Sequence, residues 1–261
     1  PAYRIWKMEG KTIYPGLIDP YLLTGSNEPG LLELDHDQHV HATADLSFHG
    51  IPSTRSDPGG RGPGFEVSGV HPQNKLVTTF QPDGEKWKAL RKNGFTMAHL
   101  APSDGIFRGT GPCVHLLNEN PNDSIVKKEV AQILAFDPVG KKETPSIYPS
   151  SLMGVFAVIR QAFLDVGYAQ HQLSYHAKNP KTLPFYSHLG IEALSAVLKK
   201  QDAMPLWIES GSCLMTNRAI KLSQEFNLSP VLIATGDEWR RPELACSKSL
   251  SYISPLIFPA L

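Results

Sequence analysis

Cysteine is scarce in this sequence. There are three, Cys113, Cys213 and Cys246, which are odd in number and lie far apart. None forms a CxxC pair, so nothing in the sequence supports a zinc knuckle or a thioredoxin-type redox site. We expect free buried thiols, with one disulfide left open as the alternative.

An excess of positive charge is also missing. Lys and Arg number 25, Asp and Glu also number 25, and the formal net charge is zero. Binding to nucleic acid or to an anionic membrane surface needs a positive excess, so neither partner is expected. Apolar residues make up 41% and charged residues 19%, which is typical of a soluble globular protein.

No apolar run is long enough to predict a membrane span. The longest, residues 152–168, is interrupted by Arg160, Gln161 and Asp165, whereas a span needs about 20 mostly apolar residues. It therefore predicts a buried helix. The chain starts at Pro1 with no signal peptide, which indicates a processed or cut product and leaves the compartment unassigned.

Two common catalytic motifs are absent as well. There is no Gly-x-Ser-x-Gly elbow, so an α/β-hydrolase triad is not supported. Glycines recur at 60–64 and 105–111, but no Lys-Ser/Thr follows them as in a P-loop. Both glycine-rich stretches predict turns.

What the sequence does contain is a regular alternation of elements after a long loop. Residues 20–75 are rich in Gly, Pro, Asp and His and predict a loop. We predict strands at 3–8, 12–18, 95–101, 112–117, 131–136, 204–208, 230–234 and 251–257. We predict helices at 84–93, 150–169, 191–200, 214–226 and 238–245. The last hundred residues have the βαβ order of a parallel sheet, so the fold class is α/β.

Several segments resemble one enzyme superfamily. Residues 10–19, Gly-Lys-Thr-Ile-Tyr-Pro-Gly-Leu-Ile-Asp, look like the entry signature of the amidohydrolase superfamily, and residues 90–96, 219–226 and 236–239 are similar to its later elements. Residues 105–109 and 148–154 resemble its imidazolonepropionase-like bacterial branch. The resemblance implies a partial or atypical TIM-like barrel over residues 15–261, preceded by a remnant of a small N-terminal β-domain at 1–14.

The resemblance also implies a metal-dependent hydrolase of C–N bonds, but the ligand positions differ. Tyr21 and Leu23 stand where the family has a His-x-His pair, and leucine cannot bind a metal. Glu209 takes the place of the fifth-strand histidine and Thr235 that of the sixth. We therefore expect no cofactor and no ordinary metallocentre.

The resemblance places Asp19, Tyr21, Glu209 and Thr235 at the barrel mouth, where barrel enzymes carry their sites. Glu209 could equally cap the helix that begins near residue 212. Arg108 is a candidate contact for an anion, although hydrogen bonding to loop carbonyls is favoured.

The histidines raise one further alternative. His39 and His41 would share a face of a strand and, with Glu209, could hold one divalent ion such as zinc, iron or manganese. A polar solvated loop is favoured there, because no third or fourth ligand is placed. For His99, a hydrogen-bonded core histidine is favoured over a catalytic one.

Only five or six barrel strands are predicted, and the family's eighth-strand Asp has no counterpart. We therefore expect a partner chain or a missing C-terminal segment to complete the barrel, because open strand edges invite pairing. The leading hypothesis is a structural or binding part of a larger assembly in which metal-dependent hydrolysis has been lost. An active C–N hydrolase with a non-standard site and a small-molecule binding module are the alternatives.

Overall fold

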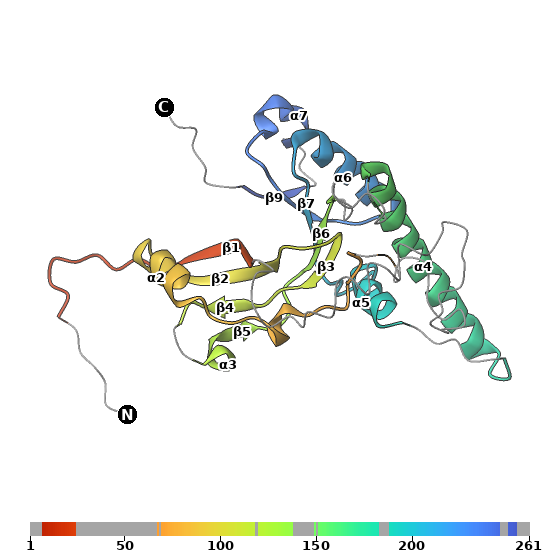
Figure 1. Cartoon of the computed structure of the whole chain (residues 1–261), viewed down its shortest axis with the longest axis horizontal. Coiled ribbons are helices and arrows are strands. Elements are labelled where there is room, and N and C mark those ends of the chain that lie inside the picture. The colour runs from red at the N-terminus through yellow and green to blue at the C-terminus, as the bar shows by residue number, and fades with distance from the viewer. Residues whose placement is uncertain are drawn as a thin grey trace.

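The computed structural model describes residues 7–24, 67, 69–117, 120–137, 149, 151–182, 188–245 and 250–254 (Figure 1). The strands within them are β1 (Leu17–Thr24), β2 (Phe95–Pro102), β3 (Phe107–Thr110), β4 (Cys113–His115), β5 (Ile125–Lys127), β6 (Gln132–Ala135), β7 (Leu206–Glu209), β8 (Val231–Ile233) and β9 (Ser251–Ile253). The α-helices are α2 (Gly84–Lys92), α3 (Pro121–Ser124), α4 (Leu152–Lys178), α5 (Leu189–Val197), α6 (Cys213–Glu225) and α7 (Pro242–Ala245). Two 3-10 turns, η2 (Leu76–Thr78) and η3 (Glu238–Arg240), complete the set.

The strands form two sheets. The first has the order β1-β2-β4-β5, in which β1 and β2 are parallel and the other pairs antiparallel. The second has the order β3-β6-β7-β8-β9, in which β6 to β9 are parallel and β3 is antiparallel to β6. The predicted α/β class is confirmed. Within the described residues neither sheet closes on itself, so these strands do not show a closed barrel.

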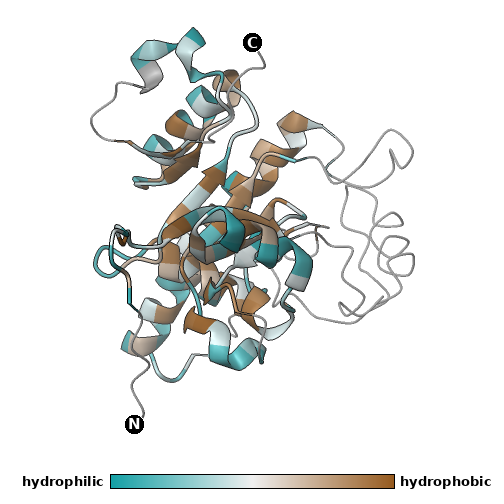
Figure 2. Cartoon of the chain, turned by 90° about the vertical axis from the view of Figure 1, so that its left-hand side faces the viewer, coloured by the Kyte–Doolittle hydropathy of each residue, from teal (hydrophilic) through white to brown (hydrophobic). Residues whose placement is uncertain are grey.

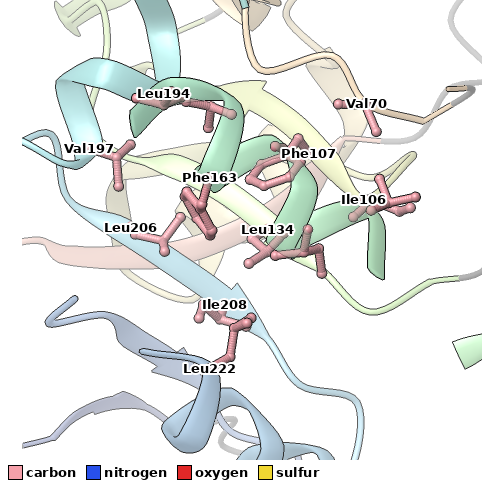
Figure 3. Packing of buried hydrophobic residues seen from close by; sticks show 14 of the residues in the cluster. Val70, Ile106, Phe107, Leu134, Phe163, Leu194, Val197, Leu206, Ile208 and Leu222 are labelled. Atoms are coloured by element: carbon pink, nitrogen blue, oxygen red, sulfur yellow. The ribbon is translucent and has the colours of Figure 1, made fainter. Parts of the chain in front are cut away.

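The larger core lies between the second sheet and helices α4, α5 and α6. Figure 3 shows Phe107 of β3 and Phe163 of α4 side by side, with their ring centroids 5.6 Å apart. Both side chains are fully buried, and such burial stabilises the fold by about 1.5–3 kcal/mol per side chain. A smaller core beneath α2 and the first sheet includes Trp87 and Leu100. Figure 2 shows apolar residues, in brown, concentrated in the middle of the molecule.

Helix α4 is the longest element. It begins after Ser151, whose hydroxyl accepts a hydrogen bond from the backbone N–H of Gly154 at 3.3 Å. By length and composition alone, α4 is the one described helix that could cross a membrane. Its seven buried residues, from Val155 to Ala169, all belong to the larger core, which is typical of a core helix.

Two predictions in the N-terminal part of the chain need correction. The strand predicted at 12–18 begins only at Leu17, and no strand is present in residues 7–16. Pro15 cannot donate a ladder hydrogen bond, and a glycine follows it, so pairing starts after both. The loop predicted from residue 20 likewise begins as the second half of β1, which runs to Thr24.

Two further differences arise near prolines and glycines. The helix predicted at 238–245 is divided into η3 and α7, because Pro242 lacks an N–H and disfavours helical geometry in the residue before it. The glycine-rich stretch 105–111, predicted as a turn, contains strand β3. The strand β5 was not predicted, and the helix predicted to end at 169 continues to Lys178.

Candidate functional site

A β-bulge positions the side chain of Arg108. In the β3–β6 ladder Phe107 pairs with Leu134 and Gly109 with Ile133, so Arg108 is left without a partner residue. Gly109 has a φ of 91°, and a Cβ there would lie 2.2 Å from the backbone oxygen of Asn74. Only glycine fits this turn of the chain. Bulges of this kind redirect a side chain, and here the side chain is a guanidinium.

A second bulge positions Tyr21. Asp19 pairs with Ala98 and Leu22 with Leu100, so two residues of β1 lie opposite the single residue His99 of β2. The carboxylate of Asp19 accepts the backbone N–H of Tyr21 at 3.0 Å, which stabilises the irregular backbone locally.

The two redirected side chains meet at Glu209, the last residue of β7. Oε2 of Glu209 accepts a hydrogen bond from the Tyr21 hydroxyl at 2.7 Å and another from Nη1 of Arg108 at 2.8 Å. Three strands that are far apart in the sequence therefore converge on one carboxylate oxygen. Charge-assisted hydrogen bonds of this length are among the stronger ones in proteins.

The guanidinium of Arg108 also donates hydrogen bonds to a second carboxylate and to two backbone carbonyls. Nη2 donates to Oδ2 of Asp137 at 2.6 Å, and the carbonyls of Gly105 and Pro102 accept from Nε and Nη1 at 3.2 and 3.3 Å. The Arg108 side chain is only 2% exposed, against 29% for Glu209 and 62% for Asp137. A charge buried this deeply needs paired partners, because its desolvation is unfavourable.

An aromatic wall borders this cluster. Trp207 lies two residues before Glu209 on β7 and therefore shares its face of the strand. The His99 ring contacts the Trp207 ring edge to face, with centroids 4.5 Å apart, and the Tyr21 ring is tilted against it at 6.4 Å. His99 of the first sheet and Trp207 of the second thus join the two sheets beside Glu209.

Burial decides the protonation of both ring systems. Burial raises the pKa of Tyr21 far above its usual range, the negative charge of Glu209 raises it further, and Arg108 acts in the opposite sense. Burial lowers the pKa of His99 to about 4, although the backbones of Pro20 and Gly111 oppose this shift. Nδ1 of His99 lies 3.1 Å from the carbonyl of Pro20, which only accepts, so Nδ1 carries the proton. Both groups are neutral at pH 7.

The remaining candidates lie in different places. The backbone N–H and the hydroxyl of Thr235 donate to Glu238 at 2.8 and 3.2 Å, so both contacts lie within its own turn. The N-cap of α6 is Ser212, whose hydroxyl accepts from the N–H of Met215. Glu209 therefore does not cap that helix. His39 and His41 lie outside the described residues.

Sequence reasoning missed two members of this arrangement. Asp137 directly follows the predicted strand 131–136 and carries the same positional signal as Glu209, a carboxylate at the end of a parallel strand. Trp207 carried no signal of its own. The carbonyl contacts of Arg108 agree with the favoured expectation, while its two carboxylate partners were not expected.

The cluster combines one guanidinium with two carboxylates, so its formal charge is −1. It has the chemistry of an ion-pair network in which one guanidinium is shared by two carboxylates. The described residues contain no group of three or more His, Cys, Asp or Glu that could hold a metal ion. The two groups bonded to Oε2 of Glu209, a guanidinium and a neutral phenol, both donate to it and are not metal ligands, so this donor set does not fit the metallocentre that the resemblance implies.

One of three comparisons with known proteins found a similar fold. No protein-family model matches the chain, and no curated protein sequence does. Among solved structures, the chain is similar to the crystal structure of an amidohydrolase from Thermotoga maritima MSB8, with a TM-score of 0.67 and 18% sequence identity. The match covers 98% of this chain and 62% of that one, so the chain spans less than two thirds of its neighbour's length. The chain has an amidohydrolase-like α/β fold.

Proposed function

We propose that this chain is a degenerate member of the imidazolonepropionase-like amidohydrolases, in which metal-dependent hydrolysis has been lost and the barrel serves as a structural or binding part of a larger assembly. One observation carries the proposal: the Glu209 carboxylate at the site's centre is held by Arg108 and Tyr21. In a catalytic metallocentre a carboxylate in this place would bind a cation. Here the cation is a guanidinium of the same chain.

The electrostatics support this reading. Arg108 is 2% exposed and neutralised by Glu209 and Asp137, so an ion that approached Glu209 would meet a fixed positive charge 2.8 Å from the same oxygen. A divalent ion at Oε2 would have to displace the guanidinium, and a buried guanidinium that loses a carboxylate partner is unfavourable. The contacts at Oε2 thus disfavour a cation at this oxygen, and they tie β1, β3 and β7 together.

The experiment is elemental analysis of the chain purified without chelators, followed by calorimetric titration with ZnCl₂ and MnCl₂. We expect zinc, iron and manganese well below one ion per chain. Glu209→Gln is the test variant. Glu129→Gln is its control, because Glu129 pairs with Lys75 outside the cluster. One tightly held ion per chain, lost in Glu209→Gln and kept in Glu129→Gln, would overturn the proposal in favour of a hydrolase with a non-standard site that uses His39 and His41.

The assembly part of the proposal is supported by the surface around β1. This edge strand and the residues before it expose large apolar side chains, with Ile13 and Tyr14 77% and 79% exposed and Ile18 56% exposed. A groove of about 580 Å³ adjoins them, lined by residues 14–17, Gly94 and Thr96. The match covers 62% of the neighbour's chain, so the other 38% has no counterpart here. We therefore infer that further polypeptide, from a partner chain or a C-terminal continuation, covers this edge.

Photo-crosslinking tests this part. A photo-reactive residue replaces Ile18 in the protein expressed in its native cells, and a matched residue replaces Glu85, which is 91% exposed on α2. We expect crosslinks from position 18 to one polypeptide sequence outside these 261 residues, identified by mass spectrometry, and none from position 85. If the photo-reactive residue at position 18 reacts only with water and gives no crosslinked protein, the edge is not covered.

A further inference from the structure

One face of the first sheet carries a group of sulfur and imidazole side chains, which we call the soft face. It belongs to β2 and β4, which Figure 1 shows side by side. In the ladder between these strands Met97 lies directly opposite His115, and His99 directly opposite Cys113. Residues directly opposite each other in an antiparallel pair share a face of the sheet, as do residues two apart on one strand. All four side chains therefore lie on the same face, away from the small core under α2.

The ladder fixes how close these side chains lie. Cβ atoms of directly opposite residues are about 4.5–5.5 Å apart, and those of residues two apart on one strand about 7 Å. Met97 faces His115 across the ladder, and Cys113 lies two residues before His115 on β4. The donor atoms of these three residues lie at the ends of rotatable side chains. One ion above the ladder is therefore within reach of all three.

The same three side chains are open to solvent and uncommitted. Met97 and Cys113 are half-buried, and His115 is exposed. Cys113 is a free thiol, and in the described part of the chain the side chains of Cys113 and His115 make no hydrogen bond or ion pair. Their sulfur and nitrogen atoms are available to a ligand without breaking an existing contact.

His99 adds a buried nitrogen lone pair on the β4 side of this face. Its Nδ1 donates to the carbonyl of Pro20 on β1, so Nε2, across the ring, is turned away from β1. Nε2 lies against Gly111, two residues before Cys113, where a Cβ would be 2.9 Å from it. His99 is 3% exposed, and within the described residues its Nε2 has no hydrogen-bond partner. Leaving such an atom unpaired is unfavourable, and a cation held near Cys113 would interact favourably with it.

The donor types indicate which cation fits. Thioether and thiolate sulfurs select Cu(I), whereas zinc in proteins takes four nitrogen, sulfur or oxygen ligands. His99, Cys113 and His115 do not form a three-ligand group by themselves in the described part of the chain, so the thioether of Met97 is needed as a ligand. We propose that Met97, Cys113 and His115 bind one Cu(I) ion on the soft face.

Binding exchanges the thiol proton of Cys113 for the ion. The S–H bond breaks, a Cu–S bond forms, the proton passes to solvent and copper remains Cu(I). Burial raises the pKa of the Cys113 thiol, while Lys127, which lies opposite Cys113 on β5, lowers it. Lys127 thus favours the thiolate that binding requires. The three ligands share no residue with the Arg108 cluster, so this inference goes beyond the proposed function and does not rest on it.

The test is titration of the full chain with Cu(I) under ascorbate, in competition with the chelator bathocuproine disulfonate. Cys213→Ser and Cys246→Ser together leave Cys113 as the one thiol, because the chain has three cysteines. This double variant is expected to bind one Cu(I) per chain with the affinity of the wild type. Adding Cys113→Ser should abolish binding, and circular dichroism checks that each variant folds. No binding by the wild-type chain in this competition would overturn the proposal.

The two other ligands are tested against matched residues on α4. Met97→Leu and His115→Gln should each weaken Cu(I) binding at least about tenfold, as loss of a partner at a metal site does. Met153→Leu and His171→Gln, at exposed positions of α4, should leave it unchanged. X-ray absorption at the copper edge should show both sulfur and imidazole nitrogen around the ion. Copper bound through sulfur alone, with an affinity that Met97→Leu and His115→Gln do not alter, would mean an adventitious thiol adduct and overturn the proposal.

Discussion

The Nη1 atom of Arg108 lies 2.8 Å from Oε2 of Glu209, although the two residues are 101 positions apart in the sequence. One sits on a bulge of β3 and the other ends β7, with β6 between the two strands. The contact therefore depends on the whole second sheet being assembled. It places a positive charge inside the fold and makes that charge part of the structure.

The two carboxylates that bind Arg108 should differ in their contribution to stability. Glu209→Gln keeps the shape but removes the charge beside a buried guanidinium, so we expect a loss of about 2 kcal/mol in the free energy of unfolding. Asp137→Asn should cost less than about 1 kcal/mol, because Asp137 is 62% exposed and water screens the pair. Urea unfolding with a shared m-value measures both. Equal losses would mean that Arg108 is not anchored chiefly by Glu209.

The hydroxyl of Tyr21 should be coupled to Glu209, to which it donates. Tyr21→Phe removes one hydrogen bond to a charged acceptor and is expected to destabilise the fold by about 1.5 kcal/mol. In a double-mutant cycle with Glu209→Gln, we expect a coupling energy of about 1 kcal/mol. Tyr14→Phe is the control, since Tyr14 is 79% exposed and such changes stay within about 0.5 kcal/mol. A coupling energy of zero would show that the two side chains act independently.

Acid should destabilise the chain through His99. Its pKa is about 4 in the fold and about 6.5 when unfolded, so between these values the unfolded state binds one more proton. Stability contributed by the neutral ring is present above pH 6.5, is lost as the pH falls toward 4, and falls no further below that. The full difference is about 3 kcal/mol.

The comparison with His99→Gln isolates this contribution from the carboxylates. Unfolding free energies of the two proteins are measured at intervals from pH 7 to pH 4. The wild-type chain should lose stability more steeply than the variant over this window. Parallel curves would show that His99 titrates normally in the folded chain.

Much of the second sheet follows from local sequence, whereas the site does not. Glu209 could be placed at a strand end because the βαβ alternation of residues 204–245 is local, and the helix over 84–93 was correctly bounded by Gly94, whose φ is 90°. The bulges at Arg108 and Tyr21 arise where two distant strands pair, and no short-range pattern reports them. Gly105 and Gly109 even favoured a turn over the strand β3. Long-range register, and not propensity, brings the cluster together.

Two glycines should respond in opposite ways to the same substitution. At Gly111 a Cβ would lie 1.8 Å from the backbone oxygen of Leu100 and 2.9 Å from Nε2 of His99, and the backbone oxygen cannot move without disturbing β2. Gly111→Ala should therefore destabilise the chain by about 3 kcal/mol. Gly167 lies within α4 with nothing inside 4 Å of the added Cβ, so Gly167→Ala should stabilise it by about 0.5–1 kcal/mol through helix propensity. Thermal and urea unfolding of both variants decide the matter, and a neutral Gly111→Ala would show that β2 and the segment after β3 do not pack as closely as described.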